Sequence, residues 1–337
     1  MMENKQDGHG NEDIRQTLKC SLGVDIGSIS TKGVVINAEG KVLAQEYLWT
    51  EGHPIDAVKR LLRSLREQLP ESVEIEAVGT TGSARKLIGV MLNADVVKNE
   101  ITAHAVGTLS KFPDVRTILE IGGQDSKIIL IRDGIVTDYA MNTLCAAGTG
   151  AFLVAQSKRL GISMEDMGEL ALRSTHPVKI AARCAVFAES DMVHKAQAGH
   201  RKEDLVAGLC VAVVSNYINN VGQGKEILEP VVFQGGVSKN SGVVQAFKEV
   251  IGMDIGVDEE SHLAGARGCA ILARQSAKRS RLKEAQKRFS FEIGDMNFRT
   301  AGRECSGCPN RCEIIQAYLD DTVLNAWGNR CDKGVSG

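Results

Sequence analysis

The sequence lacks several features that would set the protein apart from ordinary globular chains. Its net charge is only −2 over 337 residues, with no long basic stripe, so nothing favours nucleic-acid binding. The polar start has no apolar core of a signal peptide, and we expect residues 1–20 to form a disordered tail. The longest nearly apolar run, Leu205 to Ile218, is too short to cross a bilayer and predicts a buried helix. A cytoplasmic protein without membrane or nucleic-acid partners is therefore expected.

The absence of a secretion signal also bears on the nine cysteines, because disulfide frameworks belong mainly to exported chains. Metal binding or redox chemistry is then the better general interpretation. Three of them, Cys20, Cys210 and Cys269, lie in apolar or helical stretches, where we expect small buried hydrophobic residues.

What the sequence does contain is a repeat. Leu22 to Asn37 reads LGVDIGSISTKGVVIN, and 95 residues later Ile118 to Ile131 reads ILEIGGQDSKIILI without a gap. The shift aligns acids, glycines, hydroxyls and lysines: Asp25 with Glu120, Gly27 with Gly122, Ser30 with Asp125, Thr31 with Ser126 and Lys32 with Lys127. Duplication is a better explanation than coincidence.

Each copy has the pattern of a β-hairpin, in which a glycine turn with small polar residues separates two apolar runs. Glycine lets backbone N–H groups close on an oxyanion, and Ser or Thr adds hydroxyl donors. Two such hairpins facing each other would hold a polyphosphate. Neither copy reads GxxxxGK[ST] or GxGxxG, so neither a P-loop nor a dinucleotide fingerprint is indicated.

The segments around the first hairpin indicate an α/β lobe with a mixed sheet. Lys41 to Trp49 predicts a third strand, and Asp56 to Leu69 has helical periodicity. Ile75 to Thr80 predicts a strand that ends in a turn, residues 79–82, facing the ligand cleft.

These motifs resemble a known family. DIGSISTKG and EIGGQDSK are similar to the two phosphate motifs of the actin-like ATPase superfamily, which includes acetate and sugar kinases, chaperones and actin. IGGQDSK followed by CAAGTGAF resembles the ATP-dependent activators of 2-hydroxyacyl-CoA dehydratases and benzoyl-CoA reductases. The likeness spans Leu22 to Arg274. It implies a duplicated, ribonuclease H-like α/β fold over residues 21–275. Lobe I is about 21–115 plus a C-terminal helix, lobe II is about 116–260, and nucleotide lies in the cleft between them.

The resemblance also implies a set of residues for ATP or ADP with Mg²⁺. Asp25 and Asp125 are the carboxylates expected near Mg²⁺. Glu100, beside the predicted N-cap Asn99, is similar to a glutamate that positions the attacking water in chaperone ATPases, although it could simply complement the helix dipole. Gln124 and Asp125 share the proposed catalytic role. The nucleotide-binding set is Asp25, Gly27, Ser28, Ser30, Thr31, Lys32, Gly122, Gly123, Gln124, Asp125, Ser126, Gly148, Gly150, Gly235, Gly236 and Lys239.

Some of these assignments leave alternatives open. Lys32 and Lys127 suit solvated strand lysines as well as phosphate contacts, and Lys127 could simply decorate the sheet edge. Gly235 and Gly236 lie in EPVVFQGGVSK, which resembles an adenosine motif but also fits a plain strand–turn–helix.

Two further cysteines, Cys145 and Cys184, each precede a predicted helix. A helix N-terminus favours a thiolate and a negatively charged centre. Two cysteines cannot complete a four-thiolate site, whereas a two-fold dimer supplies four. From the residues alone a structural role is the simpler interpretation. The resemblance implies one 4Fe–4S cluster shared across a homodimer.

The end of the chain departs from short activators. After a basic linker over about 276–300, residues 301–337 are rich in cysteine, with C-x2-C-x3-C-x18-C spacing of Cys305, Cys308, Cys312 and Cys331. Four grouped cysteines suit Zn²⁺ or an Fe–S cluster, and free thiols are the alternative.

The resemblance implies an ATP-dependent one-electron donor to a low-potential iron–sulfur dehydratase or reductase, itself reduced by ferredoxin or flavodoxin. Two rivals stay open. A small-molecule kinase of the same superfamily would need the phosphate hairpins but no cluster. A nucleotide-dependent binding protein would use the last four cysteines for structural zinc.

Overall fold

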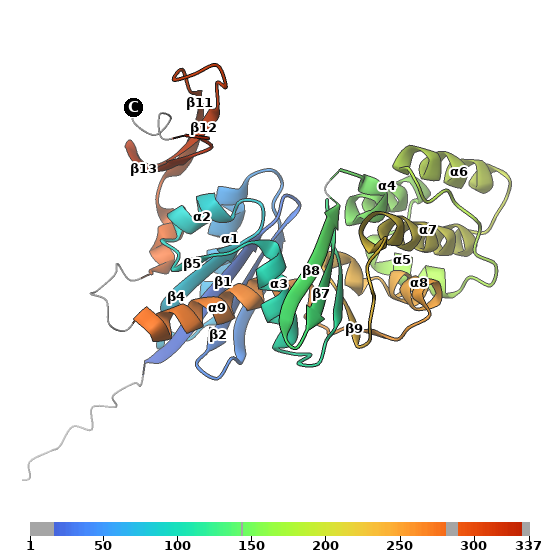
Figure 1. The fold of residues 1–337 in the computed structure, drawn as a ribbon, viewed down its shortest axis with the longest axis horizontal. Helices are drawn as coiled ribbons and strands as arrows, with labels where there is room; N and C mark the ends of the chain where they lie inside the picture. Colours follow the sequence, from blue (N-terminus) through green and yellow to red (C-terminus); the bar gives the residue numbers. More distant parts are fainter. Residues whose placement is uncertain (1–16, 143, 281–288, 332–337) are drawn as a thin grey trace, which may run out of the picture.

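The computed structural model describes residues 17–142, 144–280 and 289–331. Across this part of the chain, two five-stranded sheets with their helices lie side by side, and a small third sheet extends from the first (Figure 1). The first strand begins at Leu18, inside the segment 1–20 expected to be a disordered tail, whereas residues 1–16 lie outside the described residues.

Sheet A has the order β3-β2-β1-β4-β5. Its first three strands form an antiparallel meander, and the last two run parallel to β1. The strands are β1 (Leu18–Ile26), β2 (Ser30–Asn37), β3 (Val42–Trp49), β4 (Val73–Thr81) and β5 (Val96–Val97), with helices α1 (Pro54–Gln68) and α2 (Arg85–Met91) between them. The predicted third strand, helix and fourth strand are confirmed, with ends shifted by one or two residues.

Sheet B repeats this topology as β10-β9-β6-β7-β8. Its strands are β6 (Thr117–Ile121), β7 (Ser126–Arg132), β8 (Ile135–Asn142), β9 (Val231–Gln234) and β10 (Ile255–Gly256). The registers also repeat: Asp25 pairs with Lys32 across β1 and β2, and Glu120 pairs with Lys127 across β6 and β7. The duplication and both hairpins are therefore confirmed.

Strand alternation places the aligned acids on equivalent faces. Leu22, Val24 and Ile26 of β1 pack into a core with α1 and α2. The intervening Gly23 and Asp25 point to the other face, since successive side chains alternate. That face is covered by α9 (Ala264–Ser280), which packs on β2.

Helix α3 (Glu100–Leu109) covers the corresponding face of sheet B and contacts α9 between the two sheets. In the order of the chain, α3 falls within the predicted lobe I, which ends at about residue 115. The two helices approach very closely, because a Cβ on Gly107 would lie 1.9 Å from the Ala264 carbonyl oxygen and one on Gly268 1.8 Å from that of Ala103. These glycines are explained by packing alone.

The other face of sheet B carries a layer of helices inserted between β8 and β9. They are η1 (Ala146–Gly148), α4 (Gly150–Leu160), α5 (Met164–Leu172), α6 (Ala185–Gln197), α7 (Lys202–Tyr217) and η2 (Ile218–Gly222), and η3 (Gly236–Lys239) and α8 (Ser241–Ile251) follow β9. Residues 202–222 are long and apolar enough to cross a membrane by composition, but 72% of their apolar window is buried. This segment is the expected core helix, and Cys20, Cys210 and Cys269 are likewise buried as predicted.

After α9, residues 281–288 of the expected basic linker lie outside the described residues. A short helix, η5 (Phe291–Asp295), then packs on α1, where Arg63 pairs with Asp295 at 2.9 Å. Three antiparallel strands follow, β11 (Phe298–Glu304), β12 (Glu313–Leu319) and β13 (Thr322–Trp327), in the order β11-β12-β13. This small sheet stands beside α2 at the edge of lobe I (Figure 1).

Candidate functional site

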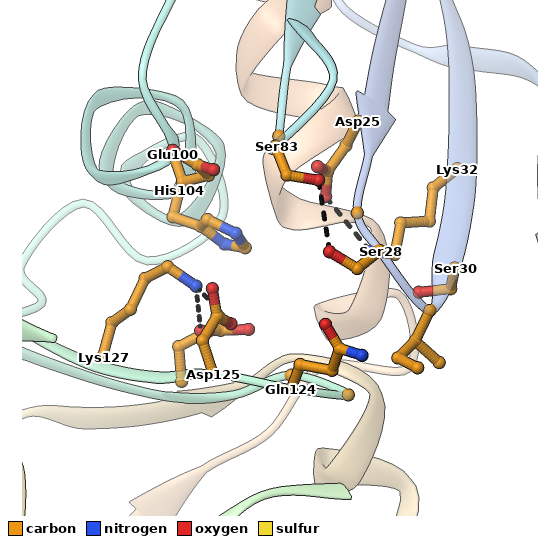
Figure 2. Close-up of a pocket in the computed structure, with 16 residues that line it drawn as sticks. Asp25, Ser28, Ser30, Lys32, Ser83, Glu100, His104, Gln124, Asp125 and Lys127 are labelled. Atoms are coloured by element: carbon orange, nitrogen blue, oxygen red, sulfur yellow. Dashed lines mark hydrogen bonds and ion pairs between the residues drawn. The ribbon is translucent and has the colours of Figure 1, made fainter. Parts of the chain in front are cut away.

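The two hairpin turns face each other across a cleft between the sheets (Figure 2). In each turn the glycine N–H donates to the carbonyl three residues on, Gly27 to Ser30 and Gly122 to Asp125, both at 2.9 Å. The tips touch, because a Cβ on Gly123 would lie 2.6 Å from the Ile29 side chain. The predicted residues that line the cleft are Asp25, Gly27, Ser28, Ser30, Lys32, Glu100, Gly122, Gly123, Gln124 and Asp125.

On the first hairpin, Asp25 and Lys32 form a buried ion pair at 3.3 Å. Burial alone would raise the pKa of the Asp25 carboxyl, but the charge of Lys32 outweighs it and holds that pKa below its usual value. The Lys32 ammonium is stabilised in return, and its pKa is raised above its ordinary value despite burial. A charged pair with an anion-attracting lysine thus faces the cleft.

On the second hairpin, Lys127 lies between two carboxylates, 3.0 Å from Glu120 and 2.7 Å from Asp125. Burial would lower the pKa of Lys127, but Glu120 and Asp125 together raise it above its ordinary value. Burial raises the pKa of Glu120 to about 7, opposed by Lys127 and assisted by the charge of Asp125. Lys127 is 2% exposed, so the alternative of a solvated lysine at the sheet edge is wrong.

Helix α3 supplies Glu100 and His104 to the same cleft. Asn99 caps this helix as predicted, since its side chain accepts from the Thr102 N–H. Glu100 is the first helical residue and contacts Arg85 at 3.4 Å. His104 is buried against Gln234, and burial lowers its pKa to about 4.

Two glycines occupy equivalent places at the carboxyl ends of β4 and β9. Gly82 has φ +93° and Gly235 has φ +90°, a conformation that favours glycine. A Cβ on Gly82 would lie 2.3 Å from the Ile26 carbonyl oxygen, and one on Gly235 2.4 Å from that of Ile121. Gly82 lies in the turn predicted to face the cleft, and it lines the cleft.

Other predicted residues support the cleft rather than line it. Thr31 is buried and bonds Thr50, whose hydroxyl donates to the Gly27 carbonyl at 2.8 Å. Ser126 is buried, and its hydroxyl has no hydrogen-bond partner among the described residues. Gly150 lets α4 approach the second turn, donating its N–H to the Gly122 carbonyl at 2.9 Å.

A third group lies around Tyr47, on β3. The Lys239 ammonium is 5.4 Å from the centre of the Tyr47 ring, and a Cβ on Gly236 would lie 3.3 Å from the Tyr47 hydroxyl. This ring therefore connects the first lobe to the expected adenosine turn. The sequence-based prediction missed it, together with Ser83 and Glu120. Glu120 could have been found, because the repeat aligns it with Asp25.

Both predicted cysteines stand directly before helices. Cys145 precedes η1, and Cys184 precedes α6. Asn142 orders the first loop, since its side chain accepts from the Cys145 N–H at 3.0 Å and donates to the Cys145 carbonyl at 3.0 Å. Both thiols are free and partly exposed.

One buried amide connects the two cysteine loops. Asn216, on α7, has its Nδ2 atom 3.9 Å from the Cys145 sulfur and donates to the Ala182 carbonyl at 2.7 Å, two residues before Cys184. It is 1% exposed. Gly148 is needed here, because a Cβ would lie 2.7 Å from the Asn216 side-chain oxygen.

The surface beside these loops is apolar. Leu144, next to Cys145, is 97% exposed, and Val186 and Phe187, just after Cys184, are 69% and 66% exposed. Large apolar side chains gathered around two thiols are typical of a surface that a partner covers. The other four predicted cysteines lie far along the chain, at one end of the third sheet: three follow β11 and one follows β13.

The Glu120 pKa leads to a prediction about stability and pH. Between its ordinary value of 4.5 and about 7, the folded protein keeps a proton that the unfolded chain has lost, so this group makes stability fall as pH rises. Glu120→Gln should match the wild type at about pH 5 and exceed it by about 2–3 kcal/mol at about pH 8, by denaturant unfolding. The lowered pKa of His104 makes stability rise with pH instead. Comparing the variant with the wild type at the same pH cancels this contribution.

Glu39→Gln, an exposed substitution, should leave the difference near zero at both pH values. A Glu120→Gln protein less stable than wild type at the higher pH would show that the ionised Glu120–Lys127 pair is net stabilising and that burial does not dominate the Glu120 pKa.

Comparison with known proteins gives one consistent result. Residues 22–273 match the model of the BadF/BadG/BcrA/BcrD ATPase family. The chain is 35% identical over 262 residues to the (R)-2-hydroxyglutaryl-CoA dehydratase activating ATPase of Acidaminococcus fermentans, covering 76% of this chain and 98% of that protein. It is 32% identical over 260 residues to the activator of lactoyl-CoA dehydratase of Anaerotignum propionicum, covering 77% and 99%.

Among solved structures, the activator of the 2-hydroxyisocaproyl-CoA dehydratase from Clostridium difficile, with bound ADPNP, superposes with a TM-score of 0.71. The two are 32% identical, and the match covers 80% of this chain and 98% of that one. The duplicated actin-like fold expected from the sequence is confirmed. The chain belongs to the BadF/BadG/BcrA/BcrD ATPase family.

Proposed function

We propose that this protein is an ATP-dependent activator that gives single electrons to an iron–sulfur dehydratase or reductase acting on CoA thioesters. By their names, the relatives reported above are an activating ATPase and activators of dehydratases that act on CoA thioesters, and one was solved with bound ADPNP. The observation that carries the proposal is a chain of contacts. It runs from the second phosphate turn to the start of α4, just after the Cys145 loop, and through Asn216 from that loop to the Cys184 loop. A small-molecule kinase would use the same cleft but has no use for those loops.

The cleft has the donors that Mg²⁺-ATP requires. The backbone turns at Gly27 and Gly122 would cradle phosphates, and the small residues Ser28 and Ser30 add hydroxyls. Asp25 and Asp125 line the cleft and would hold Mg²⁺, directly or through water. The adenosine would lie toward Gly235, Gly236 and Lys239, beside the Tyr47 ring. The metal, when bound, neutralises the charge that develops between the phosphates.

Glu100 would orient the attacking water. It begins α3 on the side of the cleft opposite the second turn, with its carboxylate directed inward (Figure 2). Arg85 holds this carboxylate from outside the cleft. Gln124, at the tip of the second turn, would assist by donating to the transferring phosphoryl group.

The cysteine loops would hold one 4Fe–4S cluster between two copies of the chain. Each copy supplies Cys145 and Cys184, and a two-fold axis through the site would make four thiolates. Cys184 stands at the N-cap of α6, where the positive end of the helix dipole would face a negatively charged cluster. Leu144, Val186 and Phe187 would become buried in the dimer, which accounts for their exposure in one chain. The cluster, when bound, supplies one electron at a time.

A change of the bound nucleotide would alter the surroundings of the cluster through a chain of groups in contact. The Gly150 and Ala151 N–H groups donate to the Gly122 and Gly123 carbonyls at 2.9 and 2.8 Å, so the second phosphate turn and α4 move together. The first residues of that segment lead to Cys145, and Asn216 joins Cys145 to the Cys184 loop. Nucleotide binding can then favour one arrangement of the loops, and that arrangement can favour electron transfer.

In this scheme, reduced ferredoxin or flavodoxin supplies the electron in the cytoplasm, and the dehydratase or reductase accepts it. Each turnover returns the activator to its oxidised form with one electron transferred and ATP hydrolysed.

The role of Glu100 predicts a selective loss of hydrolysis. Glu100→Gln should lower kcat for ATP hydrolysis by about 10²–10³-fold, because the water is no longer oriented and deprotonated. The Kd for ATP should change by less than about threefold, since the residue does not hold phosphate. Steady-state hydrolysis and nucleotide titration measure the two quantities. Glu39→Gln is the control, and a Glu100→Gln enzyme with normal kcat would refute the assignment.

The cluster assignment predicts where iron is held. Anaerobically purified wild type should contain about four iron and four sulfide per two chains. Cys145→Ala and Cys184→Ala should each reduce both to background, whereas Cys20→Ala, a buried cysteine elsewhere, should retain them. Iron at the wild-type level in both site variants would exclude the interface cluster.

If coupling runs through Asn216, replacing this residue should leave ATP hydrolysis intact but stop the cluster from responding to which nucleotide is bound. In the wild type, the rate at which a chelator removes cluster iron should differ between ADP and ATP. Asn216→Ala should make that rate independent of nucleotide, with kcat for hydrolysis within about threefold of wild type. Asn220→Ala is the matched control, because Asn220 bonds Asn216 but neither cysteine loop. A normal nucleotide response in Asn216→Ala would show that coupling follows another route.

A further inference from the structure

The third sheet is not explained by the proposed function. The family match ends at residue 273, and the relatives named above are covered over 98% and 99% of their own length without it. Its four cysteines are Cys305, Cys308, Cys312 and Cys331, all of them free thiols.

The topology of the sheet brings these cysteines to one end. The last rung between β11 and β12 pairs Glu304 with Glu313, so Cys305 and Cys312 stand opposite each other just beyond it. The Cys305 N–H donates to the Cys312 carbonyl at 2.8 Å and extends the hairpin by one bond.

The third strand returns to the same end. Strand β13 runs antiparallel to β12, and Trp327 lies opposite Ile315. Gly328 then follows with φ +107°, and a Cβ there would lie 2.2 Å from the Glu313 carbonyl oxygen. Only glycine fits this approach, which places Gly328, three residues before Cys331, beside the start of β12.

The loop between Cys305 and Cys312 contains two tight turns, each with a hydrogen bond to a cysteine. The Gly307 N–H donates to the Cys305 sulfur at 3.4 Å. A second turn follows, in which the Arg311 N–H donates to the Cys308 carbonyl at 3.2 Å and Arg311 has φ +44°. The two tight turns therefore follow one another, with Cys305 before the first and Cys312 after the second.

The sheet lacks a hydrophobic core of its own. Between residues 298 and 331, the fully buried apolar residues are Cys305, Ile314 and Ala317. The first four residues of β13 are exposed, including Val323 at 46% and Leu324 at 41%. Three short strands with so little burial gain little stability from a core of their own, and a bound metal would add to it. The four cysteines form no disulfide, so their thiols are available as ligands.

We propose that Cys305, Cys308, Cys312 and Cys331 bind one Zn²⁺ ion as a structural tetrathiolate site. Sulfurs on one tetrahedral zinc lie about 3.8 Å apart, given a Zn–S distance of about 2.3 Å. Residues opposite each other across an antiparallel pair have Cα atoms about 4.5–5.5 Å apart, which suits two ligands of one ion. Among the described residues no three His, Cys, Asp or Glu side chains stand close enough to hold a metal, so the site would form only if the sulfurs moved together on binding zinc.

The test measures zinc, iron and sulfide per chain in the anaerobically purified full-length protein. Wild type should hold one zinc per chain. Cys308→Ala/Cys312→Ala should lose the zinc and keep its iron, and Cys145→Ala/Cys184→Ala should keep its zinc. Because the two metals are counted separately, a protein with zinc but no iron would refute the proposed function and leave this inference intact.

A second measurement tests ligation directly. Protein stripped of zinc and given Co²⁺ should show the intense visible d–d bands of tetrahedral thiolate cobalt. Cys331→Ala should weaken cobalt binding at least tenfold, and Cys331→His, which restores a fourth ligand, should recover most of the affinity. No zinc in the wild type, absence of tetrahedral cobalt bands, iron and sulfide held by these four cysteines, or disulfides between them would each overturn the proposal.

Discussion

The cleft depends on one buried cation. Lys127 is almost fully enclosed, and its ammonium lies between Glu120 and Asp125. Without it, two carboxylates would face each other in a site of low polarity, at a cost of several kcal/mol. Its backbone carbonyl also accepts from the Tyr217 hydroxyl at 2.6 Å, on α7. The same residue thus neutralises the acids of the cleft and joins the hairpin to the helix that carries Asn216.

The two lobes share a topology but differ in what lies between their third and fourth strands. In lobe I the connection from β3 to β4 contains a single helix, α1. In lobe II the connection from β8 to β9 contains the layer from η1 to η2, which carries both cysteine loops. The duplication explains the cleft, because two equivalent turns can oppose each other. The inserted layer supplies two cysteine loops, which have no counterpart in the connection from β3 to β4.

Much of this could be predicted from the sequence, because the repeat is local and gapless. A hairpin is specified by its own residues, so the turn at Gly27, its copy at Gly122 and the N-cap Asn99 were all correctly identified. The burial of Lys127 was not, since a lysine on a strand has no local mark of the acids that will surround it. Asn216 was also missed: it contacts Cys145 across 71 residues, and nothing in its neighbourhood distinguishes it from any helical asparagine.

The close approach of α3 and α9 joins the helix that packs on sheet B to the helix that packs on sheet A. Gly107 and Gly268 let the two backbones touch, so the helices cross with almost no side chain between them. Such a contact tolerates rotation about the crossing better than interdigitated side chains, which must separate before they can move. The tips of the turns also touch, Ile29 against Gly123. A phosphate that entered between them would displace Gly123, and the start of α4 is bonded to Gly122 and Gly123.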